Sequence, residues 1–356
     1  MQASTVLSFI GVVQALFCVL LVGVLVVHQR RTSRHLRARQ QFASQLEEPL
    51  RAWALGERTF ESLLPELRAV PPTIALESIS VHCAVRATPV ERARMAASLR
   101  GEAWVQRVLD QHRSGKWTPR MQAARMLVVA GGPEDRPILE TLLSDPHAAV
   151  VSAALSAVPF LADESMVHSL LASLPQRADF LRARTVEELR KTTGMVLGPL
   201  RYCLQSEHTA AELVIYLGVA DQLADPRTIV ACATHATHRD ASVRQAVARA
   251  MQHYFSARAH GVLLALLQDA APEVRAEAAR TLGEIRAVTC VPALSLALRD
   301  SAHGVRLAAA LALANIGAPG ATALASAATS DDRFAADAAR FVASLSRGAI
   351  RELAEV

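Results

Sequence analysis

A repeat of 31 residues constrains this chain more than any other feature. Valine–arginine pairs recur at this spacing, with their arginines at Arg244, Arg275 and Arg306. Aspartates recur at the same spacing, at Asp269, Asp300 and Asp331. Counting back from Arg275 in steps of 31 reaches Arg120, although the register slips by three residues near 209–218. Self-similarity at such a period is typical of a solenoid, in which each unit packs on its neighbours.

Each unit is predicted to contain two helices. Between residues 262 and 267, apolar residues give the first helix one buried face, and a turn follows at 269–272. Val274, Ala278, Leu282 and Ile285 then recur at helical spacing on the second helix. No useful stretch alternates with period two, so strands are not expected. The sequence therefore predicts an all-α solenoid of stacked helix pairs.

The best-preserved unit, Asp-x-x-Pro-Glu-Val-Arg-x-x-Ala-Ala-x-x-Leu-Gly-x-Ile, starts at Asp269 and resembles a HEAT repeat. Its short period resembles the bacterial variety named after phycobilisome lyases. The resemblance covers residues 115–346 and is clearest at 240–346. Residues 50–114 are interpreted as degenerate helical units or an N-terminal cap, and 347–356 as a C-terminal tail. Polar residues in the last unit, including Asp332 and Asp337, suit a C-terminal cap.

Residues 1–28 are predicted to form a transmembrane anchor that precedes the solenoid. The apolar run at 6–27 is long enough to cross a bilayer as a helix, and no charged residue precedes it. A cleaved signal peptide is the alternative, but it would carry basic residues before the apolar run and a small-residue cleavage site after it. Here no basic residue precedes the run, and arginines follow it. The linker at 29–49 is basic, with arginines at Arg30, Arg31, Arg34, Arg37 and Arg39. This charge predicts a single-pass protein of the bacterial inner membrane with a cytoplasmic C-terminal domain.

Two columns of charged residues stand out in the repeats. The first comprises Asp240, Asp269, Asp300, Arg244, Arg275 and Arg306. The aspartates precede second helices, where they can cap amide groups, and the HEAT resemblance implies that such residues form a hydrogen-bonded ladder between repeats. The second column comprises Arg125, Arg249 and Arg280, five residues after the ladder arginines. On HEAT second helices this column would face the groove and bind an acidic partner; an ordinary solvated helix face is the alternative.

Composition and motifs argue against most enzyme classes. Outside the five juxtamembrane arginines the basic and acidic residues balance, and aromatic residues make up only 4%, which disfavours nucleic-acid binding. The five cysteines and 12 histidines lack metal-site spacing, and no His-Glu dipeptide occurs, as iron-binding HEAT enzymes would require. No metal, cofactor or catalytic residue is expected.

The sequence therefore predicts a membrane-tethered scaffold or adaptor that is not an enzyme. Its solenoid would bind a protein partner, with a membrane enzyme such as an envelope glycosyltransferase as one candidate. Two alternatives remain open: a phycobilin-lyase-like or other HEAT-fold enzyme acting on a small molecule, and a DNA-repair glycosylase acting on nucleic acid.

Overall fold

The structure, a computed structural model, describes residues 40–86, 89–192, 194–254 and 256–354. All regular secondary structure in these residues is helical, which confirms the all-α prediction for this part of the chain. The chain divides into two compact units, Met1–Ala157 and Val158–Val356. No helix in the described residues is both long enough and apolar enough to cross a membrane. The predicted span at 6–27 lies outside the described residues.

The first unit packs around its helix at residues 117–130. Residues 40–54 are helical, so residues 40–49 of the predicted linker are part of a helix. The elements that follow are η1 (Phe60–Leu63), α2 (Leu64–Arg68), α3 (Pro72–Arg86), α4 (Pro89–Arg100), α5 (Ala103–Leu109), η2 (Asp110–Arg113), α6 (Trp117–Ala130), η3 (Pro133–Asp135), α7 (Arg136–Leu143) and α8 (Ala148–Leu155). Helix α6 contacts α3, α4, α5 and α8, and its Met126 and Leu127 are fully buried among them.

The second unit contains the clearest repeats. Its elements are α9 (Val158–Leu161), α10 (Glu164–Ser173), η4 (Leu174–Gln176), α11 (Asp179–Lys191), α12 (Leu197–Gln205), α13 (Ala210–Leu223), η5 (Pro226–Thr228), α14 (Ile229–Ala233), α15 (Ala241–Ala250), η6 (Met251–His253), α16 (Ala257–Leu266), α17 (Pro272–Glu284), η7 (Val288–Cys290), α18 (Val291–Ala297), α19 (His303–Ile316), α20 (Ala318–Ala328), α21 (Arg333–Ser344) and α22 (Arg347–Ala354). Helix α22 occupies the predicted tail and contacts α19.

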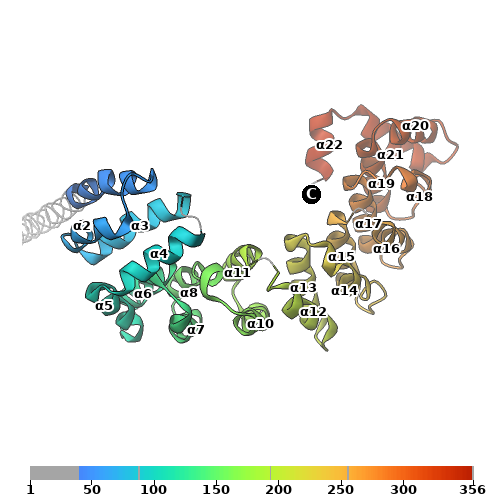
Figure 1. Cartoon of the computed structure of the whole chain (residues 1–356). Coiled ribbons are helices and arrows are strands. Elements are labelled where there is room, and N and C mark those ends of the chain that lie inside the picture. The colour runs from blue at the N-terminus through green and yellow to red at the C-terminus, as the bar shows by residue number, and fades with distance from the viewer. Residues whose placement is uncertain (1–39, 87–88, 193, 255, 355–356) are drawn as a thin grey trace, which may run out of the picture. The chain divides into compact units, whose positions relative to one another are not determined.

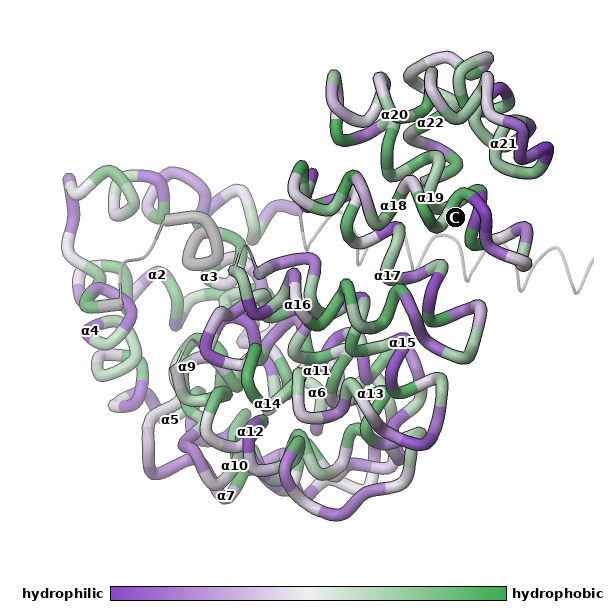
Figure 2. The backbone as a smooth tube through the Cα atoms, turned by 90° about the vertical axis from the view of Figure 1, so that its right-hand side faces the viewer, coloured by the Kyte–Doolittle hydropathy of each residue, from purple (hydrophilic) through white to green (hydrophobic). Residues whose placement is uncertain are grey.

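Helices α12 to α21 of this second unit form two rows (Figure 1). We call α13, α15, α17, α19 and α21 the second-helix row, because each is the second helix of its repeat and contacts the next in the row. Helices α12, α14, α16, α18 and α20 form the other row. Hydropathy changes within single helices (Figure 2), as expected when one face is buried. The predicted stripe of α17 is buried, with Val274, Ala278 and Leu282 all fully enclosed.

Gly283 and Gly317 have different roles in the second-helix row. Gly317 follows α19 with φ 92°, a left-handed conformation that glycine adopts at little cost. Gly283 lies inside α17, and Arg286, with φ 49°, takes the left-handed position after that helix. A Cβ atom at Gly283 would lie 2.5 Å from Cα of Ala312. Gly283 therefore permits the close approach of α17 to α19.

Candidate functional site

Arginine–aspartate pairs join neighbouring repeats of the second-helix row. Arg244 of α15 donates from Nε and Nη2 to the two carboxylate oxygens of Asp269, both at 2.7 Å. Arg275 of α17 makes the same contact with Asp300, at 2.7 and 2.8 Å. The remaining nitrogen of Arg275, Nη1, donates to the backbone oxygens of Asp269 and Ala270. Each arginine thus holds the loop before its own helix and the carboxylate of the next repeat.

The aspartates of these pairs also order their own loops. Oδ1 of Asp269 accepts a hydrogen bond from the backbone N–H of Ala271 at 2.9 Å, and Asp300 accepts from Ala302 at 2.8 Å. Hydrogen bonds from Arg244 lower the pKa of Asp269 against the opposing effect of burial, and Arg275 does the same for Asp300. Both carboxylates are therefore held in the ionised form.

The ladder is interrupted on both sides of these two pairs. Asp240 is the N-cap of α15, where its Oδ1 accepts from the backbone N–H of Ser242 at 2.9 Å. The position that matches Asp269 is His238, whose backbone oxygen accepts from Arg244 at 2.7 Å. At the other side, Arg306 donates to the backbone oxygens of Asp300 and Ser301. Its guanidinium lies 4.8 Å from the ring centre of Phe334.

The first unit contains a third pair of the same kind. Arg120 donates from Nε and Nη2 to Asp145 at 2.6 and 2.9 Å, and from Nη1 to the backbone oxygen of Ser114. The sequence analysis missed this pair, because it compared arginines with arginines and aspartates with aspartates. A search for arginine followed 25 residues later by aspartate finds all three pairs and also Arg306 with Asp331, between which the described residues show no ion pair.

Arg249 and Arg280, predicted to contact a partner, meet at a residue that the sequence analysis did not single out. Glu277 of α17 is only 5% exposed. Its Oε1 accepts from Nε of Arg249 at 3.0 Å, and its Oε2 accepts from Nη1 of Arg280 at 2.8 Å and from Gln245 at 3.2 Å. Burial alone would raise the pKa of Glu277, but hydrogen bonds from Arg249 and Gln245 and the positive charges of Arg249 and Arg280 outweigh it and lower that pKa.

Both arginines remain open to solvent although Glu277 holds them. The side chain of Arg249 is 55% exposed and that of Arg280 is 30% exposed. Within the described residues, Nη1 of Arg249 has no hydrogen-bond partner, because Glu277 binds only Nε and Nη2. The buried carboxylate therefore orients two guanidinium groups whose side chains are still partly exposed to solvent.

Further charged groups lie on or beside the same helices. Asp221 of α13 accepts from Gln252 at 2.7 Å and lies 3.0 Å from Nε2 of His253. Partial desolvation raises the pKa of Glu284, and the negative charge of Glu277 adds to this rise. We call these residues the α13–α17 charged surface: Asp221, Arg249, His253, Glu277, Arg280 and Glu284. It contains two arginines, one histidine and three carboxylates.

The third member of the predicted partner column lies elsewhere. Arg125 is on α6, in the first unit, and its side chain is exposed. Within the described residues it makes no hydrogen bond or ion pair, and no carboxylate there corresponds to Glu277. The structure therefore connects two of the three column arginines through one buried acid and leaves Arg125 on the solvated face of its helix.

The described residues hold no group of three or more potential metal ligands. Cys203, Cys232 and Cys290 are buried and form no disulfide. Burial raises the pKa of the Cys232 thiol to about 12, which keeps it in the unreactive neutral form. These three cysteines pack as small, buried apolar residues.

The comparisons with known proteins fit this geometry. Residues 260–345, which include α17 to α21, match the family model for HEAT repeats. This part of the chain is therefore made of HEAT repeats, which agrees with its stacked helix pairs. A search of curated protein sequences gave no match.

Several solved structures align over most of the chain. An engineered protein is 18% identical, with 84% of this chain and 92% of that one covered and a TM-score of 0.34. Human deoxyhypusine hydroxylase is also 18% identical, with 71% and 98% covered and a TM-score of 0.30. Kap121p is 14% identical, with 79% and 42% covered and a TM-score of 0.35. Scores this low carry no argument about function.

Proposed function

We propose that this chain is a protein-binding scaffold that acts at a membrane and has no catalytic step of its own. The observation that carries the proposal is the α13–α17 charged surface, in which Glu277 holds Arg249 and Arg280 in fixed positions. Solenoids of stacked helix pairs present extended surfaces that suit the binding of other proteins. A surface of paired charges with partly exposed guanidinium groups is suited to binding another protein, whereas catalysis needs a pocket with a nucleophile or base.

The partner is proposed to carry acidic residues at the contact. A guanidinium with free N–H groups binds a carboxylate through short, charge-assisted hydrogen bonds. Because Glu277 already restricts the side chain of Arg249, binding would lose less side-chain entropy than it would with a freely rotating arginine. The neighbouring acids Asp221 and Glu284 would repel an acidic segment that docked out of register, so they would contribute specificity.

A triple variant that replaces three charged side chains with neutral ones tests the surface. Reversing the arginines to glutamate would leave buried Glu277 facing like charges, so we would instead combine Arg249→Gln, Glu277→Gln and Arg280→Gln. Glutamine can replace the lost hydrogen bonds without a buried unpaired charge. Partners that copurify with the full chain in detergent would be quantified by mass spectrometry. We expect the amount of at least one copurified partner to be lower by about tenfold or more with the triple variant than with the unmodified chain.

The matched control removes two arginines from the other helix row. Arg201 of α12 and Arg258 of α16 are exposed, and neither has an ion-pair partner in the described residues. The variant with Arg201→Gln and Arg258→Gln should keep every partner that the unmodified chain binds. Equal recovery of all partners by the triple variant and by the control would remove the charged surface from the interface and refute the proposal.

The membrane tether is proposed from residues 6–27 and the arginines that follow them. A tether would confine the solenoid to the membrane surface and raise its effective concentration near membrane enzymes. The charge asymmetry supports a solenoid on the cytoplasmic side of a bacterial inner membrane. A C-terminal green fluorescent protein fusion should therefore fluoresce, and a C-terminal alkaline phosphatase fusion should be inactive. The opposite pattern would place the solenoid outside the cytoplasm.

A further inference from the structure

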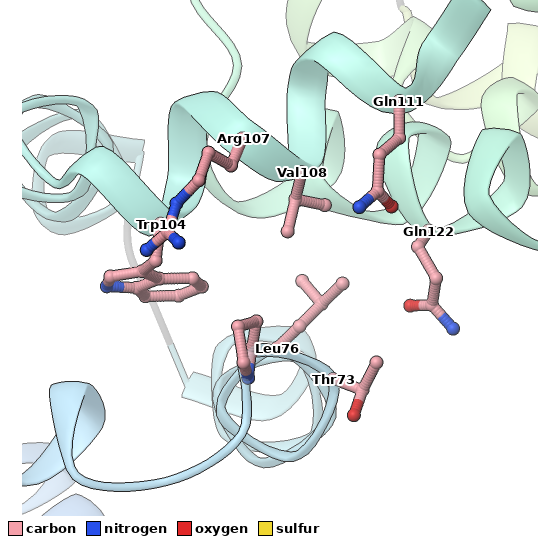
Figure 3. A pocket seen from close by; sticks show the side chains of 8 residues that line it. Thr73, Leu76, Trp104, Arg107, Val108, Gln111 and Gln122 are labelled. Carbon is pink, nitrogen blue, oxygen red and sulfur yellow. The ribbon is translucent and has the colours of Figure 1, made fainter. Parts of the chain in front are cut away.

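The start of α6 carries the most exposed tryptophan of the described residues. Trp117 is 42% exposed, whereas Trp104 is 7% exposed and lies beside Leu76 inside the first unit (Figure 3). The ring of Trp117 stacks on that of His147, the N-cap residue of α8, with 4.4 Å between the ring centres and 1° between the ring planes. This stack covers one face of the indole and holds the exposed part of the ring in one orientation.

Unpaired basic residues accompany this tryptophan. Residues 111–133 contain no aspartate or glutamate. Arg113 and Lys116 are exposed, and neither forms an ion pair in the described part of the chain. Arg120, the next basic residue, is neutralised by Asp145. We call four residues the α6 entry surface: Arg113, Lys116, Trp117 and His147.

The α6 entry surface is hollowed where its two loops meet. A cavity of about 420 Å³ lies between the residues that precede α6 and those that precede α8. Its lining includes the ammonium group of Lys116 and the hydroxyl group of Thr118, which can donate to an anionic oxygen. The indole of Trp117 forms an apolar part of the same lining. Tryptophan beside lysine and arginine is typical of protein surfaces at the headgroup level of a membrane.

The length of chain before the first unit keeps this surface near a bilayer. The apolar run ends at residue 27, and the described helix begins at residue 40. Residues 28–39 can extend to at most about 40 Å, at about 3.3–3.6 Å per residue. Helix α6 alone has 14 residues and is about 21 Å long at 1.5 Å per residue. A membrane that holds residues 6–27 is therefore always within about one domain diameter of the first unit, which raises its effective concentration there.

We propose that the α6 entry surface binds the anionic phospholipid headgroups of the membrane that holds the tether. The indole of Trp117 would lie at headgroup level, and Arg113 and Lys116 would bind lipid phosphates. Headgroups match both the positive charge and the exposed ring, and the tether keeps them within reach. An acidic protein segment would match only the charge. The inference rests on the tether in the proposed function and adds a second membrane contact, made by the first unit.

Quenching of tryptophan fluorescence by spin-labelled lipid tests this contact. The full chain is reconstituted into vesicles of phosphatidylcholine and phosphatidylglycerol, in which some choline groups carry a nitroxide that quenches indoles at headgroup level. We expect part of the emission to be quenched. That part should be absent from Trp117→Phe, which should fold because position 117 is exposed. Vesicles with the same quencher but without phosphatidylglycerol should quench Trp117 much less.

Two double variants separate this surface from general charge. Each lysine or arginine near an anionic membrane changes the ratio of bound to free surface about fivefold. Arg113→Gln with Lys116→Gln should therefore lower this ratio for Trp117 about 25-fold. The matched control combines Arg94→Gln with Arg125→Gln, which are exposed positions of α4 and α6 in the same unit. The control should leave the quenching of Trp117 unchanged.

Three outcomes would overturn the proposal. They are the lack of quenching at Trp117, equal quenching with and without phosphatidylglycerol, and equal effects of the two double variants. Two soluble probes identify other ligands of the chain in detergent. A shift of the Trp117 emission with glycerol phosphate, without quenching in vesicles, would assign the cavity to a free phosphate ester. The same result with poly-glutamate would assign the surface to an acidic protein.

Failure of the proposed function gives a different result. Flotation of the vesicles after an alkaline wash shows whether the chain is inserted in the bilayer. A chain that does not float would refute the tether and this inference together, whereas a floated chain without quenching at Trp117 would refute this inference alone. The triple variant at Arg249, Glu277 and Arg280 should show normal quenching of Trp117 even if no partner copurifies.

Discussion

The same substitution at two glycines of the second unit should change stability in opposite directions. Gly261 lies in α16, and a Cβ atom there would meet nothing within 4 Å. Alanine in a helix is more stable than glycine by about 0.5–1 kcal/mol, so Gly261→Ala should stabilise the chain by that amount. At Gly283 the new Cβ would lie 2.5 Å from Cα and 2.7 Å from Cβ of Ala312, far inside the ~3.5–4.0 Å of carbon contacts.

The overlap at Gly283 involves backbone atoms of α19, so no side-chain rotation can relieve it. Overpacking of this kind costs about 1–3 kcal/mol, which exceeds the gain in helix propensity. Gly283→Ala should therefore lose roughly 1–2 kcal/mol. Urea unfolding of the full chain in detergent, followed by circular dichroism, measures both variants against the unmodified protein. A stabilising effect at both positions would refute the close approach of α17 and α19.

Two further predictions concern the ladder. Arg275→Ala removes a bidentate pair and two loop contacts and leaves Asp300 without its cation, so it should lower the free energy of unfolding by about 3 kcal/mol. Arg306→Ala removes only backbone hydrogen bonds and the contact with the Phe334 ring, so it should lower that free energy by about 1–2 kcal/mol. Equal losses for the two variants in urea unfolding would contradict this ranking. Arg275 holds the pKa of Asp300 in the folded chain below its ordinary value of 3.8. The unfolded chain therefore binds a proton at Asp300 more readily than the folded chain does. The stability that this pair contributes is fully present above about pH 4 and is lost as the pH falls through the lowered pKa. Asp300→Asn should flatten this acid loss between about pH 2 and 5, and an unchanged pH dependence would exclude Asp300 as a contributor.

The helix pairs and their buried faces could be predicted from the sequence, because the same residue pattern occurs in several repeats. Val274, Ala278 and Leu282 occupy helical spacing that recurs one repeat later, and all three are buried. Glu277 could not be found in the same way, because alanine occupies its position one repeat later, at Ala308. Its role depends on two helices brought together by packing.

The remaining differences also depend on distances between helices. Asp240 precedes its helix as Asp269 does, but it lies two residues beyond the ladder position, so it caps α15 instead of joining the ladder. The need for glycine at position 283 follows from the nearness of Ala312, which no local pattern encodes.

The interruption of the ladder divides the second unit into parts that should open independently. Arg244–Asp269 and Arg275–Asp300 connect α15, α17 and α19, whereas His238 and Phe334 stand at the two ends of this run. Local opening in a protein occurs in cooperative segments, and amide protons within one segment exchange together with solvent deuterium. Amides of α15, α17 and α19 should therefore exchange together and last. Those of α13 and α21 should exchange earlier, because neither helix is held to the central three by a ladder ion pair.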